Sequence, residues 1–206
     1  MSEPKEILIL FAHPVYSRSL VQKALRRAVA DIKNVTIHDL YAHYPDFIID
    51  PDKEQALLVK HDIIIFQHPY YWYSTPSILK EWQDIVLENH FAFGSGGTYL
   101  KDKDFFHVIS TGAAIEQYET GMLKDTSFKE VFTPTRLMAR LTQMHWHPPF
   151  IIDGIIQKDT RLEQACTDYR RILFAMQEGY FDFSVVDQHD YMNNIIDDAI
   201  NLPEGF

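Results

Sequence analysis

The stretch DIIIFQHPYYWYSTPSILKEW, residues Asp62–Trp82, joins an apolar run to an amphipathic helical pattern through a loop rich in aromatic residues. Residues 62–68 are too continuously apolar to have one solvated face, which is typical of a strand buried on both sides of a parallel sheet. Pro69 and the pair Thr75-Pro76 stiffen the turn that follows. The stretch therefore predicts one strand–loop–helix unit of an α/β fold.

The same alternation of strand-like and helical patterns continues along the chain. We expect strands at Glu6–Ala12, Val35–Leu40, Asp62–His68, Phe105–Thr111 and Pro149–Ile156. Helix starts are indicated by a candidate N-cap at Ser19, by acceptor–proline pairs at Asp50-Pro51, Thr75-Pro76 and Thr133-Pro134, and by a capping box of Thr160 and Glu163. This order predicts an α/β, flavodoxin-like fold, a five-stranded parallel sheet with helices on both faces. Ligands of such sheets bind beyond the carboxyl ends of the strands, where the strand order reverses.

Length and charge indicate the domain organisation. The 206 residues suit one α/β domain, which we place at residues 1–180. Residues 181–206 hold no Lys or Arg and form an acidic C-terminal extension, with Asp182, Asp187, Asp190, Asp197, Asp198 and Glu204. We expect a solvated extension in preference to an acidic docking arm.

Composition argues against several classes of function. A formal net charge of −10 disfavours nucleic-acid binding, which needs basic side chains to replace the counterions around phosphates. The single cysteine, Cys166, excludes an internal disulfide and fits a small side chain in a helical pattern. His145 and His147 alternate as two metal ligands would, but no third ligand stands nearby, so we favour a structural role and expect no metal.

Targeting signals are not evident in the sequence. The N-terminus does not read as a signal peptide, and the apolar runs are far shorter than a membrane span. We therefore expect a cytoplasmic protein without direct membrane insertion.

The first informative loop, AHPVYSRSLVQ at Ala12–Gln22, follows the first expected strand. It lacks G-x-G-x-x-G and G-x-x-x-x-G-K-[ST], which disfavours a Rossmann dinucleotide site and a P-loop. Ser17 and Ser19 lie at a helix N-terminus, where free backbone N–H groups and the helix dipole favour an anion such as phosphate. His13 and Arg18 could add charge-assisted donors. The alternative is that the serines only cap the helix.

The second loop contains four consecutive aromatic residues, Tyr70, Tyr71, Trp72 and Tyr73. Because flanking prolines stiffen the turn, these side chains cannot all point into the core, and some must present aromatic surface at the sheet edge. A pocket for a flat heteroaromatic ring needs such walls. The alternatives are an aromatic cluster packed under the helix at residues 76–87 or a partner interface.

The third loop, STGAAIEQYETG at Ser110–Gly121, follows the fourth expected strand. Its small residues allow a ligand to approach the backbone closely, and Tyr118 adds a hydroxyl donor. Each loop alone is a weak signal. A phosphate site, an aromatic wall and a small-residue turn at three strand ends together predict a mononucleotide with a planar ring, for which flavin is the natural candidate.

Several segments around these loops carry a family resemblance. They are AHPVYSRS, HDLYAHYPDFIID, FQHPYYWYSTPSILKEWQD, FAFGSGG, STG and MHWHPPF, within residues 5–177. The chain resembles the flavodoxin-like NAD(P)H:quinone oxidoreductases, and within them it looks most like the ancillary quinone reductases of glutathione-regulated potassium efflux systems. The resemblance implies a bound FMN, with FAD as the alternative found in the larger mammalian-type enzymes, and NAD(P)H as co-substrate.

The resemblance also implies site residues by position. The phosphate end of the flavin would be surrounded by His13, Ser19, Leu20, Val21 and Gln22, with Ser17 added from the loop pattern. The isoalloxazine would lie along Tyr70, Tyr71, Trp72 and Tyr73, and its other edge would face Ser110, Thr111, Gly112 and Ala113. Tyr118 matches a tyrosine that assists charge development on the flavin, which makes it the catalytic candidate. The chain departs from the family pattern at Gln22, Ala113 and Lys124, where the usual residues are Asn, Gly and, in the mammalian-type enzymes, His.

The implied reaction is a two-electron hydride transfer from NAD(P)H through flavin N5 to a quinone. Backbone N–H groups around Gly112 and Ala113 would stabilise negative charge on the reduced flavin. Members of the family are usually homodimers, and residues 91–93 fall where a partner-facing loop would contribute. The competing hypothesis, from the same resemblance, is a regulatory ancillary subunit of a glutathione-gated potassium efflux antiporter, acting independently of turnover and held at the inner face of the cell membrane by its partner. A flavin-free signalling domain is a third interpretation, against which the absence of a clear acidic cluster after the first strand counts.

Overall fold

The protein is built around one parallel sheet. The computed structural model describes residues 3–118, 126–154 and 160–202. The sheet runs in the order β2 (Val35–Asp39), β1 (Ile7–Phe11), β3 (Ile63–Pro69), β4 (Asp104–Ser110), and β4 also pairs with β5 (His145–Trp146) and β6 (Phe150–Ile152). All of these pairings are parallel. The chain moves outward from β1 to β2 and then returns to the other side at β3, so the strand order reverses between β1 and β3, as the flavodoxin-like prediction requires.

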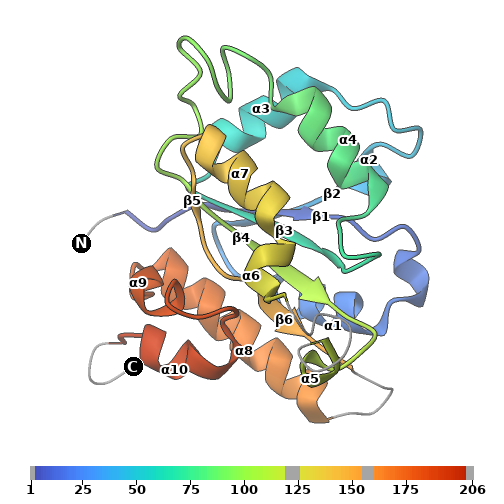
Figure 1. Cartoon of the computed structure of the whole chain (residues 1–206), viewed down its shortest axis with the longest axis vertical. Coiled ribbons are helices and arrows are strands. Elements are labelled where there is room, and N and C mark those ends of the chain that lie inside the picture. The colour runs from blue at the N-terminus through green and yellow to red at the C-terminus, as the bar shows by residue number, and fades with distance from the viewer. Residues whose placement is uncertain (1–2, 119–125, 155–159, 203–206) are drawn as a thin grey trace.

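Helices cover both faces of this sheet (Figure 1). One face carries α1 (Leu20–Val29) and α8 (Thr160–Gln177), and the other carries α3 (Pro51–Lys60), α4 (Ser77–Val86) and α7 (Thr133–Leu141). Short elements complete the described chain: α2 (Leu40–His43), α5 (Ile115–Gln117), α6 (Phe128–Val131), α9 (Phe183–Val186), α10 (Ile196–Ala199) and the 3-10 segments η1 (Tyr16–Arg18) and η3 (Asn193–Ile195). Within the described ranges, no helix combines the length and the apolar character needed to cross a membrane.

The central strands are buried on both faces, as their apolar runs predict. Every residue of β1 is fully buried. Ile7, Ile9 and Phe11 pack with α1 and α8, whereas Leu8 and Leu10 pack with the helices of the opposite face. The strand period of two therefore divides one apolar run between two cores.

The fifth strand differs from its prediction. The expected run Pro149–Ile156 contains β6, whereas β5 precedes it at His145–Trp146, and residues 155 and 156 lie outside the described residues. Both segments pair with β4, but Phe105 lies opposite Trp146 and Val108 lies opposite Phe150, so one extra residue stands between them on the β5–β6 side. Pro148 and Pro149 fall at this bulge, because a proline has no N–H to donate to the ladder.

Two of the predicted caps are confirmed and two are wrong. Ser19 accepts a hydrogen bond from the Gln22 backbone N–H at 3.1 Å, and Asp50 accepts one from Lys53 at 3.2 Å. Thr75 caps nothing, because α4 begins after Pro76 without a side-chain cap. Thr133 lies inside α7, where its hydroxyl donates to the Glu130 carbonyl, since α6 leads directly into α7. The capping box expected at Thr160 adjoins residues 155–159, outside the described part.

The C-terminal segment is not a solvated extension. Val186, Met192 and Ala199 are fully buried and belong to the same core cluster as α8. Among its described acidic residues, Asp187, Asp190, Asp197 and Asp198 are exposed, and Asp197 pairs with Arg171 at 2.6 Å. The expectation of a solvated segment was wrong because the acidic residues are interspersed with apolar ones that reach the core. A domain boundary at residue 180 remains a prediction.

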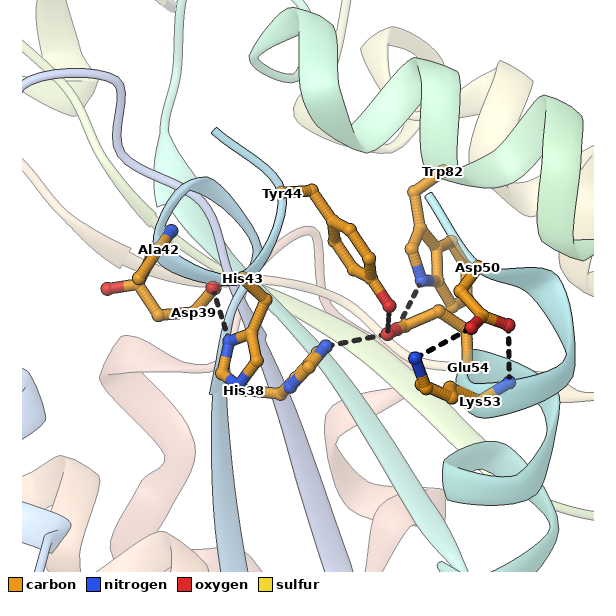
Figure 2. A network of polar contacts seen from close by, with 9 residues as sticks. All are labelled: His38, Asp39, Ala42, His43, Tyr44, Asp50, Lys53, Glu54 and Trp82. Atoms are coloured by element: carbon orange, nitrogen blue, oxygen red, sulfur yellow. Dashed lines mark hydrogen bonds and ion pairs between the residues drawn. The ribbon is translucent and has the colours of Figure 1, made fainter. Parts of the chain in front are cut away.

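A buried carboxylate joins the segment after β2 to α3 and α4, which cover the face of the sheet opposite α1 and α8 (Figure 2). Glu54 of α3 accepts hydrogen bonds from the Tyr44 hydroxyl at 2.6 Å and the Trp82 indole N–H at 2.8 Å, and its Oε1 lies 2.7 Å from Nε2 of His38. Burial alone would raise the pKa of Glu54, but these three partners outweigh burial and hold that pKa below its usual range. Glu54 therefore stays ionised while fully enclosed.

Candidate functional site

Three loops meet at the carboxyl edge of the sheet, after β1, β3 and β4. The rings of His13 and Tyr71 lie 6.4 Å apart, which joins the first loop to the second. The Tyr70 backbone N–H donates to the Ser110 carbonyl at 2.8 Å, and the rings of Tyr70 and Tyr118 are 6.2 Å apart, which joins the second loop to the third. The structure thus brings the three predicted loops together.

The first loop offers hydrogen-bond donors. His13 is buried, and burial lowers its pKa, so its imidazole is neutral at pH 7. Its Nδ1 accepts the Val15 backbone N–H at 3.1 Å, so the ring proton sits on Nε2, where it can be donated. Ser19 caps α1 through its oxygen, which leaves its hydroxyl hydrogen available. The loop therefore suits a ligand rich in acceptor atoms.

The other predicted residues of the first loop lie around this cap. Leu20 and Val21 open α1, and Leu20 is exposed. Ser17 is exposed within η1, and its carbonyl accepts from Lys23, so the structure does not bring the Ser17 side chain into a described contact with the other two loops. Gln22 is fully buried.

The second loop is a tight hairpin turn. Tyr71 and Ser74 exchange backbone hydrogen bonds at 3.2 and 2.9 Å, and Trp72 and Tyr73 between them have φ angles of +50° and +61°. Two consecutive left-handed residues make a type I′ turn, which usually holds Asn and Gly because side chains clash there. Trp72 is 94% exposed, whereas Tyr70 is 7% exposed and packs in an aromatic cluster with Tyr118. As expected, only part of the aromatic run enters the core.

The third loop presents open backbone. A Cβ atom at Gly112 would meet nothing within 4 Å, and the Thr111 hydroxyl fixes the turn by donating to the Ala113 carbonyl at 2.7 Å. Tyr118 is buried, and its pKa is raised by burial and by the neighbouring Tyr73, so it is a neutral phenol at pH 7. Lys124 and Gly121 lie outside the described residues.

Comparison with known proteins identifies the family. The sequence profile of a family described as having a flavodoxin-like fold matches residues 5–173. The chain belongs to this flavodoxin-like family.

Relatives within the flavodoxin-like family include both a curated protein and solved structures. The glutathione-regulated potassium-efflux system ancillary protein KefG of Shigella flexneri serotype 5b is 46% identical over 152 residues, which are 74% of this chain and 83% of the relative. The general stress protein 14 of Treponema denticola, solved in complex with FMN, superposes with a TM-score of 0.78 at 35% identity, covering 84% of this chain and 99% of that one. An NADPH-quinone reductase from P. pentosaceus superposes with a TM-score of 0.72 at 29% identity, covering 82% and 97%.

Sequence reasoning missed the polar residues beneath the candidate site of this flavodoxin-like fold. Gln67 of β3 and Tyr169 of α8 are buried, and they hydrogen-bond in a chain that reaches Gln22 and Ser110. A signal for Gln67 was present, because a lone amide inside an apolar strand must find buried partners. Nothing local in the sequence marked Tyr169.

The two histidines considered as metal ligands have separate environments. His145 is exposed and lies 3.7 Å from Asp102. His147 is buried between Asp104 at 3.0 Å and Asp187 at 2.8 Å. In the described part of the chain, no three His, Cys, Asp or Glu side chains gather in a metal-binding arrangement. The thiol of Cys166 is partly buried against the core that β1 forms with α1 and α8, and burial raises the pKa of this thiol.

The segment expected to face a partner subunit lies partly in the core. Phe91 and Ala92 are buried in the cluster under α4, and Phe93 packs against that cluster. Their roles at a subunit interface remain a prediction.

Proposed function

We propose that this protein binds FMN at the carboxyl edge of its sheet and acts as a flavin-dependent NAD(P)H:quinone oxidoreductase. The observation that carries the proposal is the convergence of a capped helix N-terminus, an exposed aromatic turn and an open glycine turn at the reversal of strand order. The similarity to a family member solved with FMN and to an NADPH-quinone reductase supports it.

The residues present fit a phosphorylated flavin. His13 Nε2 and the Ser19 hydroxyl are donors beside the N-terminus of α1, which suits a phosphate. The open space at Gly112 allows a flat ring to approach the backbone. The Tyr70 hydroxyl is buried without a hydrogen-bond partner among the described residues. A polar ligand bound beside it would supply the missing partner. FAD remains the alternative that the family resemblance allows.

The chain would contribute binding, orientation and electrostatics. When bound, FMN would supply the two-electron redox chemistry between NAD(P)H and a quinone. Tyr71, Trp72 and Tyr73 would form an aromatic wall that orients flat reactants and excludes water. Gly112 would direct its backbone N–H toward the polar edge of the ring. Tyr118, held protonated by burial, would be a neutral donor close to that edge.

The first test is the visible absorption spectrum of the purified protein, with mass analysis of whatever acid releases. A flavin spectrum with released FMN is expected, followed by NAD(P)H oxidation that depends on added quinone. Released FAD would correct the cofactor. Protein that carries no flavin and takes up neither FMN nor FAD would overturn the proposal.

We also propose a second role, as a cytoplasmic ancillary subunit of a potassium efflux system, because a relative of that name is 46% identical over most of the chain. Such a subunit would be held at the inner face of the cell membrane by its transporter, and the family resemblance further suggests a homodimer. Potassium efflux should be measured in cells that carry a Ser19→Ala, Gly112→Val double variant, with flavin content checked in parallel. If the flavin-free variant still activates efflux, the regulatory role does not require turnover. If activation is lost together with the flavin, the regulatory role depends on the flavin site.

A further inference from the structure

Four buried or half-buried polar side chains form a line beneath the carboxyl edge of the sheet. The Tyr169 hydroxyl donates to Gln67 Oε1 at 2.9 Å, Gln67 Nε2 donates to Gln22 Oε1 at 2.9 Å, and Gln22 Nε2 donates to Ser110 Oγ at 3.0 Å. The first three side chains are fully enclosed, at 1% exposure or less. The line therefore runs from the core under α8 to the third loop of the candidate site.

The direction of this hydrogen-bond relay is set at its buried end. Burial raises the pKa of the Tyr169 phenol, so it keeps its proton and must place it on an acceptor. In the described structure its acceptor is Gln67 Oε1. The Gln67 amide must then turn its NH₂ group toward Gln22, which in turn directs its own NH₂ group toward Ser110. Reversing the relay would bury the phenol hydrogen without a partner, which is costly.

The consequence appears at Ser110, the last residue of β4. Its oxygen accepts from Gln22, so its hydroxyl hydrogen is left to point away from the relay, toward the site. The Gln22 backbone N–H likewise donates to the Ser19 oxygen, which leaves the Ser19 hydroxyl hydrogen free to be donated. That bond does not depend on the direction of the side-chain relay. The two serines thus become donors by independent means.

We propose that Tyr169 and Gln67 are positioning residues that fix Ser110 as a hydrogen-bond donor to an acceptor atom on the riboflavin half of the cofactor. This inference rests on the proposed flavin site. Ser19, at the N-terminus of α1, would serve the phosphate instead. Flavin affinity would then depend on a phenol in the core that never touches the ligand.

A double-mutant cycle in flavin affinity tests the relay. FMN and riboflavin are titrated into flavin-stripped protein, wild type and variants, and binding is followed by flavin fluorescence. Tyr169→Phe is expected to weaken both ligands by the same factor, about 3–10-fold, because the lost hydrogen bond lies on the part they share. Ser110→Ala should do likewise, and the double variant should bind no more weakly than Ser110→Ala alone. Ser19→Ala should weaken FMN and leave riboflavin unchanged.

Controls separate positioning from stability. Tyr44→Phe also removes a buried phenol hydrogen bond, to Glu54 on the opposite face, and should leave both affinities unchanged. Gln22→Asn, which shortens the link while keeping the cap of α1, should reproduce Ser110→Ala if Tyr169→Phe folds poorly. Unchanged affinity in Tyr169→Phe, or effects of Tyr169→Phe and Ser110→Ala that multiply, would overturn the relay alone. Wild-type protein that binds neither ligand would overturn the proposed function and the relay with it.

Discussion

Glu54 shows how much a single enclosed residue can stabilise a fold. Its carboxylate has three partners from three different elements and no exposed surface to compensate for their loss. Glu54→Gln replaces one acceptor oxygen by an NH₂ group that faces other donors. We expect the free energy of unfolding to fall by about 2–3 kcal/mol, measured by urea denaturation. Glu81→Gln on the exposed face of α4 is the matched control and should change it by less than about 0.5 kcal/mol; an equally small effect at Glu54 would contradict the structural role.

At the scale of single residues, the sequence predicted the interactions that form between near neighbours in the chain. The cap at Ser19 depends on a residue three positions away, so the pattern alone identified it. The two side-chain partners of Gln67, Gln22 and Tyr169, stand 45 and 102 positions away in the chain, and no local pattern encodes such pairings. The same limit explains why the site residues could be grouped by loop while the polar support beneath them was missed.

The aromatic turn is an element under local strain. Trp72 and Tyr73 both adopt left-handed backbone, which costs about 1–2 kcal/mol per residue. The double variant Trp72→Asn, Tyr73→Gly should therefore raise the free energy of unfolding by about 1 kcal/mol or more, while flavin affinity falls at least several-fold. Thermal unfolding and flavin titration measure the two effects.

Gln143 provides a matched control for that turn, because it follows α7 with a φ of +62° on an exposed surface away from the three loops. Gln143→Gly should increase stability and leave flavin affinity unchanged. If the turn variant gained stability without losing affinity, strain there would have no connection with ligand binding.

His147 ties the C-terminal segment to the sheet, since it lies between Asp104 of β4 and Asp187 at the end of α9. Burial alone would lower the pKa of His147, but the two carboxylates outweigh burial and raise it above 6.5. A raised pKa in the folded state adds stability that is present below pH 6.5 and is lost as the pH rises through the folded value. The pKa of Asp104 is held low against its own burial, so its contribution is lost only in acid, below about pH 4.

The wild type should therefore lose more stability between pH 6 and pH 9 than His147→Gln does. Urea denaturation at both pH values gives the change in the free energy of unfolding for each protein. Other titrating groups are common to both proteins, so their contributions cancel when the two changes are compared. His145→Gln, an exposed histidine two residues away, should follow the wild type. Parallel pH profiles for the wild type and His147→Gln would show that the imidazolium does not hold the segment.

Elements were predictable where one pattern ran uninterrupted. The first four strands were placed within a residue or two of their observed ends. β1, β3 and β4 are largely apolar runs, whereas in β2 the apolar Val35 and Ile37 alternate with polar residues. The fifth was predicted only in part. β6 lies inside the expected run Pro149–Ile156, but His145 and Trp146 before the two prolines also pair with β4, and they were missed because they are not apolar as a pair. Bulges depend on the partner strand, which a single segment cannot reveal.

For the whole molecule, the misjudged feature was the C-terminal segment. Charge dominated its composition, yet its buried residues recur between the acidic ones and close the core beneath α8. A count of charges over the segment concealed this pattern. Net charge bears on solubility and association, and it does not show whether the apolar residues of a segment pack into a core. The parallel order of the sheet, in contrast, followed from the alternation of strands and helices along the entire chain.

Truncation after Tyr180 tests whether residues 1–180 form a domain of their own. It removes Val186, Met192 and Ala199, all fully buried, and uncovers the side of α8 on which they pack. Burial of a Val or Met side chain stabilises by about 1.5–3 kcal/mol, so the combined loss is comparable to the roughly 5–15 kcal/mol that holds a domain together. The truncated chain should therefore lose cooperative thermal unfolding and bind a hydrophobic dye. The full-length variant Asp190→Asn, which changes only an exposed charge of the same segment, should unfold as the wild type does. A truncated chain with a sharp transition and wild-type flavin affinity would instead establish residues 1–180 as the complete folding unit.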